Sequence, residues 1–213
     1  MANYKVKSQD LVEKVHSIIK LMILKHQLVP GQKLIQEDLA EKIGVSRTPL
    51  LAALSKLEKE FLVESRPRRG YYIRKLSKAE ELNLFDIRLR VEPLAAKGAA
   101  ENINTREGKD LLKKAELTPR QLESLDHLSF SEYDFEFHRS IQELSKNEFL
   151  YKMISSYNLI SLSNQIPLTV FAPSVENHLE LARVIAEGKS DEAEKIMFRH
   201  ISMGRDRIQA GGE

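Results

Sequence analysis

The 213-residue sequence contains no cysteine and no tryptophan, and only 7% of its residues are aromatic. Without cysteine the chain can form neither a disulfide nor a thiolate metal site. No apolar run approaches the length that spans a membrane, and residues 1–5 contain no apolar segment of the kind found in signal peptides. We therefore expect a cytoplasmic protein that does not bind a membrane.

What the chain does contain is typical of soluble globular proteins, with 42% hydrophobic and 30% charged residues. Its length suits one large or two small domains. Residues 1–76 hold 15 basic and 8 acidic residues, a net charge of +7, whereas residues 77–213 hold 18 and 23, a net charge of −5. This asymmetry indicates nucleic-acid contact by the first part and a different task for the second.

A helix is predicted to begin near Ser46 and to run to about Glu60. Its apolar stripe recurs with helical spacing and consists of Leu50, Leu54, Leu57 and Phe61. Ser46 or Thr48 is placed to cap this helix, and a proline at the first turn costs no hydrogen bond. The opposite face carries Arg47, Thr48, Leu51 and Ala52, which suits a helix that enters a DNA major groove. An ordinary surface helix would show the same stripe, so the flanking sequence decides.

The flanking sequence predicts two more helices and a hairpin. One helix begins at Ser8 and ends before Pro30-Gly31, and a second covers 37–43, where Gly44 stops it. Residues 62–65 and 71–74 indicate two short strands around the basic turn 66–70. Three helices followed by a basic hairpin are the layout of a winged helix-turn-helix, whose wing would contact phosphate or the minor groove. A solvated turn is the alternative.

From residue 77 onward the pattern is helical almost throughout. We expect helices at 79–102, 106–124 with a break at Thr118-Pro119, 130–145, 147–166, 174–187 and 190–210. Asn147 and Ser190 stand where N-caps are expected. The predicted fold is mainly α, with a winged helix-turn-helix domain at 1–76 joined to an antiparallel bundle of about six helices at 77–213.

Four residues with metal-binding groups stand among apolar neighbours in this bundle: Asp134, His138, His178 and His200. Asp134 and His138 are spaced i, i+4, so they share one helix face. Three imidazoles and a carboxylate suit a borderline divalent metal and leave positions for water or a ligand. Each residue also has a simpler interpretation, because Asp134 could form a capping box with Ser131 and a lone histidine is often a structural hydrogen-bonding group.

The N-terminal part resembles the DNA-binding domain of the GntR family of bacterial transcription regulators. The family's PG-x-x-L, DLA, GVSRTP, AL-x-x-LE and wing RRG elements lie in register in LVPGQKLIQEDLAEKIGVSRTPLLAALSKLEKEFLVESRPRRGYYI. The resemblance implies that Arg47 reads a guanine edge and that Ser46 and Thr48 hold phosphates. Gly70 would let the wing tip approach the DNA backbone, where Arg68 and Arg69 are expected to contact phosphate or the minor groove.

Two positions depart from the family's pattern. Leu51-Ala52 stands where the family usually has Arg-Glu, so an expected base- or phosphate-reading arginine is missing. This replacement bears on operator sequence and affinity. Phe61 stands where the family has glycine before Leu62, and we expect this second departure to affect packing only.

Residues 77–213 resemble the FCD domain, the ligand-binding half of the FadR-like branch of GntR regulators. The segment FDIRLRVEPLAAKGAAE contains its R-x-x-x-E pair, Arg88 and Glu92, and DFEFH supplies its D-x-x-F-H element. HLELARVIAEGKSDEAEKIMFRHI supplies its H…G…A…M-x-x-H element, with Lys189 where the family often has aspartate. By this resemblance, the metal-binding positions of the family's metal-binding subset fall on Asp134, His138, His178 and His200.

The resemblance implies that this metal, whether zinc, nickel or manganese, helps to hold a small carboxylate effector. Arg88 would be a second anchor for the effector's charge, with a salt bridge to Glu92 as the alternative. Asn158 and Asn164 are polar positions that we expect to line the pocket.

The sequence is thus identified as a member of the GntR family. It would be a homodimeric, ligand-responsive transcription regulator and not an enzyme, and its partners would be a pseudo-palindromic double-stranded operator and a small organic acid. One alternative is a metal-dependent enzyme with an accessory nucleic-acid-binding domain. Another is an FCD regulator that takes a bulky acyl ligand and no metal. The lack of an additional base in the motif segments argues against the first, and the intact four-ligand set argues against the second.

Overall fold

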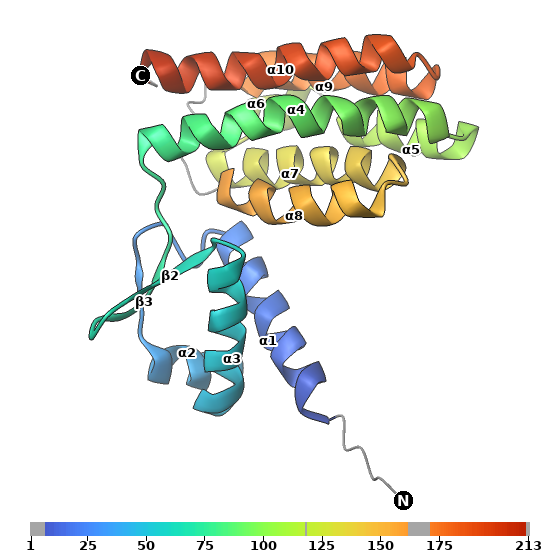
Figure 1. Ribbon diagram of the computed structural model, residues 1–213. Coiled ribbons are helices and arrows are strands. Elements are labelled where there is room, and N and C mark those ends of the chain that lie inside the picture. The colour runs from blue at the N-terminus through green and yellow to red at the C-terminus, as the bar shows by residue number, and fades with distance from the viewer. Residues whose placement is uncertain (1–6, 118, 162–170, 212–213) are drawn as a thin grey trace, which may run out of the picture. The chain divides into compact units, whose positions relative to one another are not determined.

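The protein is described by a computed structural model that covers residues 7–117, 119–161 and 171–211. The chain divides into two compact units, Met1–Lys75 and Leu76–Glu213. Within the described ranges, the first unit contains α1 (Lys7–Leu24), α2 (Gln36–Ile43), α3 (Arg47–Lys59) and the short strands β1 (Lys33–Leu34), β2 (Val63–Arg66) and β3 (Gly70–Ile73) (Figure 1). Three helices and a small sheet confirm the winged helix-turn-helix part of the predicted fold class.

The apolar stripe predicted on α3 forms the centre of the first unit. Leu50, Leu54 and Leu57 are fully buried, and α3 packs against α1, where Val15 and Ile19 are also fully buried. Ser46 occupies the N-cap of α3, but its side chain makes no capping hydrogen bond, so the expected cap by Ser46 or Thr48 is not formed. Burial of the stripe therefore holds α3 in place.

Phe61, the last member of the predicted stripe, behaves differently from the three leucines. It is 54% exposed and has a φ of 60°, directly after the end of α3. The Leu62 amide donates to the Leu57 carbonyl at 3.0 Å, which closes a helix end in which the left-handed residue is usually glycine. The expectation that this replacement affects packing only is therefore wrong, because a side chain in the left-handed region costs about 1–2 kcal/mol.

The sheet has the order β1-β3-β2, and both pairs are antiparallel. The hairpin of β2 and β3 is the predicted wing, with Arg66 opposite Gly70 at its tip. The strand β1 was not predicted, because two residues are too short to show an alternating pattern. It adds to the sheet by pairing Lys33 with Tyr72 and Leu34 with Tyr71.

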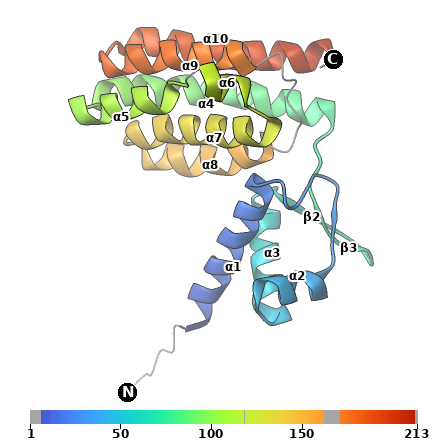
Figure 2. The same ribbon diagram turned by 180° about the vertical axis from the view of Figure 1, so that it is seen from behind.

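In the second unit, all the secondary-structure elements that the structure describes are helices, as predicted. It contains α4 (Lys78–Asn102), α5 (Thr105–Ala115), α6 (Pro119–Glu123), α7 (His127–Leu144), α8 (Glu148–Ser161), α9 (Phe171–Ala186) and α10 (Ser190–Ala210). Within this unit α9 and α10 form one layer, α4 and α5 a second, and α7 and α8 a third, while α6 lies on the face turned to the viewer in Figure 2. The core fills the space between α4, α7, α9 and α10.

Helix ends in this unit test several local predictions. Asn147 caps α8 by accepting a hydrogen bond from the Leu150 amide at 3.0 Å, as predicted. The assignment of Ser190 as an N-cap is wrong by one position, because Ser190 is the first residue of α10 and Lys189 precedes it. The predicted 106–124 helix is two helices, α5 and α6, separated near the expected break.

The start of α7 decides how Asp134 is used. Asp126 caps this helix by accepting from the Ser129 amide at 2.7 Å. Asp134 therefore lies well inside α7, and the alternative in which it completes a capping box with Ser131 is wrong. Its side chain is left for tertiary contacts.

None of the described helices has both the length and the apolar composition of a membrane-spanning segment.

Candidate metal centre and DNA-contacting surface

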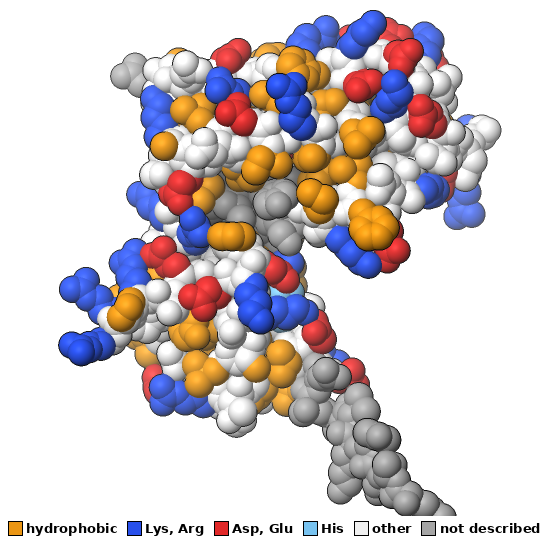
Figure 3. Space-filling view, in the orientation of Figure 1, with side chains coloured by type: hydrophobic (Ala, Val, Ile, Leu, Met, Phe, Trp, Pro, Cys, Tyr) orange, Lys and Arg blue, Asp and Glu red, His pale blue; other side chains and the backbone are white. Residues whose placement is uncertain are grey.

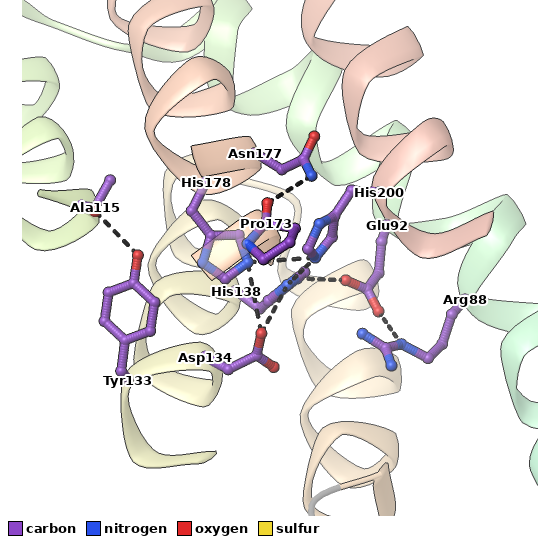
Figure 4. Close-up of polar contacts among 10 residues, drawn as sticks. All are labelled: Arg88, Glu92, Ala115, Tyr133, Asp134, His138, Pro173, Asn177, His178 and His200. Atoms are coloured by element: carbon purple, nitrogen blue, oxygen red, sulfur yellow. Dashed lines mark hydrogen bonds and ion pairs between the residues drawn. The ribbon is translucent and has the colours of Figure 1, made fainter. Parts of the chain in front are cut away.

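Four side chains from three helices meet in the core of the second unit (Figure 4). Asp134 and His138 come from α7, His178 from α9 and His200 from α10. One possible ligand atom from each lies within 4.8 Å of the others. These are the four residues that the sequence singled out, and the folding of α7, α9 and α10 against α4 brings them together.

The spacing of the donor atoms suits a single ion. The Nε2 atom of His200 lies 3.2 Å from Nε2 of His138 and 3.3 Å from Nε2 of His178. Two nitrogens bound to one ion at about 2.1 Å would be roughly 3.0–3.4 Å apart in octahedral or tetrahedral geometry. An Oδ1 atom of Asp134 lies 3.5 Å from Nε2 of His178 and 3.8 Å from Nε2 of His138. The cluster could therefore hold a divalent metal.

Electrostatics also favour a cation between these groups. Burial holds the pKa of His178 well below its usual value, and the rings of His200 and His138 lower it further. Burial, then His138 and Arg88, lower the pKa of His200 to about 3. Burial raises the pKa of Asp134, although His138 and Arg88 oppose this shift. Buried imidazoles and a buried carboxylate are unfavourable without a partner in the core. A metal ion bound by neutral imidazoles and a carboxylate would stabilise these groups.

His138 differs from the other two histidines. Burial disfavours its charged form, but the carboxylates of Glu92 and Asp134 outweigh burial and raise its pKa. The Glu92 carboxylate lies 2.6 Å from Nδ1 of His138 through one oxygen and accepts from Nε of Arg88 at 2.5 Å through the other. Burial raises the pKa of Glu92, but the charges of Arg88 and His138 lower it more.

Glu92 is a site residue that sequence reasoning used only as a partner of Arg88. A signal for it was present, because Glu92 continues the buried face of α4 that runs through Leu84, Arg88, Ala96 and Ala99. A carboxylate in such a stripe is rarely left without a partner in the core. The distance along the chain hid its second partner on α7.

His178 is surrounded by aromatic side chains. Its ring stacks on Phe137 with centroids 4.3 Å apart, and Tyr133 lies 5.4 Å away. In the part of the chain that the structure describes, Nδ1 of His178 is buried without a hydrogen-bond partner. The ring therefore makes its polar contacts at Nε2, which faces the cluster.

The residues expected to bind an effector are only partly placed. Arg88 is buried and forms the intrahelical ion pair with Glu92, and its guanidinium lies over the Phe85 ring at 4.8 Å. Figure 4 shows the outer nitrogens of Arg88 on the side toward Asp134. The side chain of Asn158 and the whole of Asn164 lie outside the described residues.

In the first unit, the residues expected to meet DNA lie at the start of α3. Ser46, Arg47 and Thr48 are exposed, and Leu51 is half-buried. Arg47 donates from Nε to the Gln36 side chain at 3.1 Å and lies 3.4 Å from the Glu37 carboxylate. Both partners come from the first turn of α2, and sequence reasoning did not foresee them.

The wing exposes its two middle arginines. Arg68 and Arg69 are exposed in the turn between β2 and β3, and Arg68 has a φ of 62°. Gly70 begins β3 with a φ of 88°, a conformation that other residues rarely adopt. Arg66 is held by Glu64 and lies over the Tyr72 ring at 4.2 Å. The turn therefore presents cationic side chains from a braced hairpin.

A three-helix unit with a basic wing, joined to a helical unit with a buried polar cluster, defines a winged-helix regulator. Residues 11–73 match the family described as bacterial regulatory proteins, gntR family, and residues 83–203 match the FCD domain. The chain belongs to the GntR family and carries an FCD domain. It is a DNA-binding transcription regulator and not an enzyme, which sets aside the enzyme alternative.

Relatives along almost the whole chain agree with this assignment. The Nta operon transcriptional regulator of Aminobacter aminovorans is 27% identical over 188 residues, which cover 88% of this chain and 89% of that protein. The HTH-type transcriptional repressor RspR of Escherichia coli K12 is 24% identical, with 91% of this chain and 87% of that protein covered.

Solved structures share the fold. Escherichia coli McbR/YncC has a TM-score of 0.83 at 20% identity, and the match covers 94% of this chain and 97% of that one. A GntR regulator from Rhodococcus sp. RHA1 has a TM-score of 0.80 at 18% identity, with 95% and 99% covered. These likenesses support the architecture of both units.

Proposed function

We propose that this regulator senses a small organic acid at a divalent metal held by Asp134, His138, His178 and His200. The convergence of these four donors within 4.8 Å carries the proposal. An effector carboxylate would take a position that the protein leaves open on the metal, and Arg88 would be a second anchor for the effector's negative charge. Binding would regulate the protein by favouring one arrangement of the two DNA-binding units in a dimer over another.

The experiment is a metal analysis of the purified protein followed by thermal unfolding with single organic acids. We expect close to one zinc, nickel or manganese ion per chain. An acid that binds the loaded protein should raise its melting temperature, and chelation of the metal should abolish that increase. Absence of metal would contradict the metal site. Bound metal without a shift by any acid would contradict sensing and leave the metal a structural role.

We infer that the regulator is a homodimer, which matches the two-fold symmetry of a pseudo-palindromic operator. The support is an apolar patch on neighbouring helices of the second unit, where Figure 3 shows hydrophobic side chains gathered over α4 and α8. Ile87 and Leu94 on α4 and Phe149 and Met153 on α8 are exposed, and Phe149 is 84% exposed. A two-fold axis would place this patch against the same patch of a second copy.

Sedimentation equilibrium of matched variants tests this dimer. Leu94→Asp combined with Phe149→Asp should convert the protein to a monomer and weaken operator binding, because each half-site would then be bound alone. Phe198→Asp is the control, because Phe198 is 44% exposed on α10, outside the patch. A dimer that survives the double variant would place the interface elsewhere.

We also propose that Leu51 alters the operator. It lies on the same face as Arg47, and an apolar side chain there can contact a thymine methyl but cannot donate to guanine. Selection of bound sites from random DNA should yield a half-site that differs from the family's common one. Recovery of the common half-site would contradict this role.

We propose that the protein acts in the cytoplasm, where its operator DNA lies.

A further inference from the structure

Glu92 is a buried carboxylate that connects the four candidate metal ligands to Arg88, whose charge is permanent. It is 1% exposed, and its two oxygens contact different partners. One accepts from Nε of Arg88 at 2.5 Å, and the other lies 2.6 Å from Nδ1 of His138. The chain of contacts therefore runs from Arg88 through Glu92 to His138 and ends at the donor atoms (Figure 4).

The direction of each hydrogen bond in this chain follows from the groups. Arginine can only donate, and beside its fixed charge Glu92 is a carboxylate that can only accept. Nδ1 of His138 must therefore carry the proton. The lone pair of a neutral His138 ring is then at Nε2, which faces His200 at 3.2 Å and Asp134 at 3.8 Å.

We propose that Glu92 is the positioning residue of the metal centre, which fixes His138 in the tautomer that presents Nε2 to the ion. This inference rests on the metal site proposed above. A carboxylate behind a histidine ligand orients the ring and makes it a stronger donor, and its loss typically weakens metal binding about 10–100-fold. The described part of the chain shows no such partner for Nδ1 of His178.

Arg88 has a defined part in this arrangement. It neutralises Glu92, so that the core holds an ion pair and not an isolated charge. It also fixes which oxygen of residue 92 is available to His138. An effector that contacts Arg88 would therefore act on the same chain of groups that orients a metal ligand.

The proposal makes an unusual prediction for Glu92→Gln. Arg88 would still need an acceptor and would take the glutamine carbonyl oxygen. The glutamine NH₂ would then face His138 and donate to Nδ1, which moves the ring proton to Nε2 and directs it at the metal position. Zinc affinity, measured by competition with a chromophoric chelator, should fall about 10–100-fold.

A second substitution should restore binding. In Arg88→Met, Glu92→Gln, the glutamine is released from the arginine and can turn its carbonyl oxygen toward His138. The Nδ1–H tautomer then returns, and zinc affinity should recover to within about tenfold of the parent. If Glu92 had only a packing role, removing Arg88 as well would not improve binding. Replacing a buried ion pair as a whole by neutral groups is also well tolerated by folded proteins.

Asp86→Asn is the matched control, because it removes an exposed ion pair from α4 to Arg205 on α10 without touching the cluster. Its zinc affinity should equal that of the parent. Parental zinc affinity in Glu92→Gln would overturn the proposal. A double variant that binds no more tightly than the single one would also overturn it.

A metal-free measurement separates this proposal from the metal site itself. Long-range ¹H–¹⁵N spectra of the histidine rings report which nitrogen carries the proton. The neutral His138 ring should be protonated at Nδ1 in the parent and the double variant and at Nε2 in Glu92→Gln. If the parent bound no zinc, the proposed metal site would fail, while these spectra would still test Glu92. A His138 ring protonated at Nδ1 in Glu92→Gln overturns the positioning role.

Discussion

The two units place their functional side chains in opposite environments. In the first unit, Arg47 and its partner Glu37 have side chains that are 63% and 70% exposed. In the second, the His178 side chain is fully buried and Glu92 is 1% exposed. An exposed ion pair contributes about 0–1 kcal/mol, whereas breaking a buried charge network leaves groups without partners and costs several times more.

This difference follows from what each unit would bind. A surface that reads DNA has to be accessible to a large partner. Its arginines therefore form only exposed, weak ion pairs within the protein, and their substitution should leave the fold intact. A metal centre needs donors that converge within a few ångströms, and the packed core of the second unit brings four such donors together. Substitutions at the two sites should therefore separate DNA binding from metal binding.

The strongest separation is expected from His138→Ala combined with His178→Ala. This variant should lose stoichiometric zinc and the stabilisation that a bound metal provides, about 2.7 kcal/mol at a hundredfold excess over Kd. Operator binding by the first unit should persist. Metal analysis, urea unfolding with and without zinc, and DNA titration measure the three properties. Arg199→Ala, next to His200 but exposed, should keep its metal. Stoichiometric zinc in the double variant would show that these histidines do not hold the metal.

Arg47→Ala tests whether DNA binding can be lost while stability is retained. Loss of a base-reading arginine should weaken operator binding by about 1–3 kcal/mol and relax discrimination at one operator position. Stability should change little, because the contacts of Arg47 are exposed. Fluorescence titration of operator variants and urea unfolding measure both effects. Arg106→Ala, exposed in the second unit, is the control. Unchanged operator affinity would mean that α3 is not placed as proposed.

The pH dependence of stability should reveal the buried histidines. In metal-free protein, His178 and His200 have lowered pKa values, that of His200 at about 3, so the unfolded chain binds more protons as the pH falls below about 6.5. Their contribution to stability is present above that pH and is lost below it. His138, whose pKa is raised, has the opposite effect and offsets only a small part of this loss, because its contribution to stability is greatest below the unfolded pKa.

We therefore expect the free energy of unfolding to fall by about 1–2 kcal/mol between pH 6.5 and 5.5 in the presence of a chelator. Urea titrations at a series of pH values measure this change. A variant with His178→Asn and His200→Asn should have a flatter profile. A parent profile that is equally flat would contradict the burial of these two rings in neutral form.

The wing should contribute through charge alone. Arg68→Ala and Arg69→Ala should each weaken binding to all DNA sequences similarly and reduce the slope of log affinity against log salt by about one unit per lost phosphate contact. Arg66→Ala provides a comparison, because Arg66 already pairs with Glu64. Titrations on operator and unrelated DNA at several salt concentrations measure the slopes. An operator-specific loss would indicate base contact by the wing.

The smallest effect concerns the strained end of α3. Phe61→Gly should stabilise the first unit by about 0.5–1 kcal/mol, because glycine adopts a positive φ without steric cost and loses part of that gain as chain entropy. Phe61→Ala keeps a Cβ atom and should give no such gain. Urea unfolding compares the two variants. Equal stability of both would show that the backbone there is unstrained.

Local patterns in the sequence predicted most of the elements. The helix expected at 190–210 has those bounds, and the α3 stripe is buried as its spacing required, apart from Phe61. Prediction failed where too few residues carried a signal, as in β1, or where the backbone conformation mattered more than polarity, as at Phe61. A helical repeat depends on neighbouring residues, so it can be read without knowing the fold.

The sequence alone determined the family, the two-part architecture and the four candidate metal ligands, because residue type and spacing carry that information. It also placed Arg88 and Glu92 on one helix face. Only the tertiary structure decided that Glu92 also meets His138 on α7, and that Gln36 and Glu37 hold Arg47. These contacts join separate elements, and their geometry depends on how whole helices pack, which no local pattern specifies.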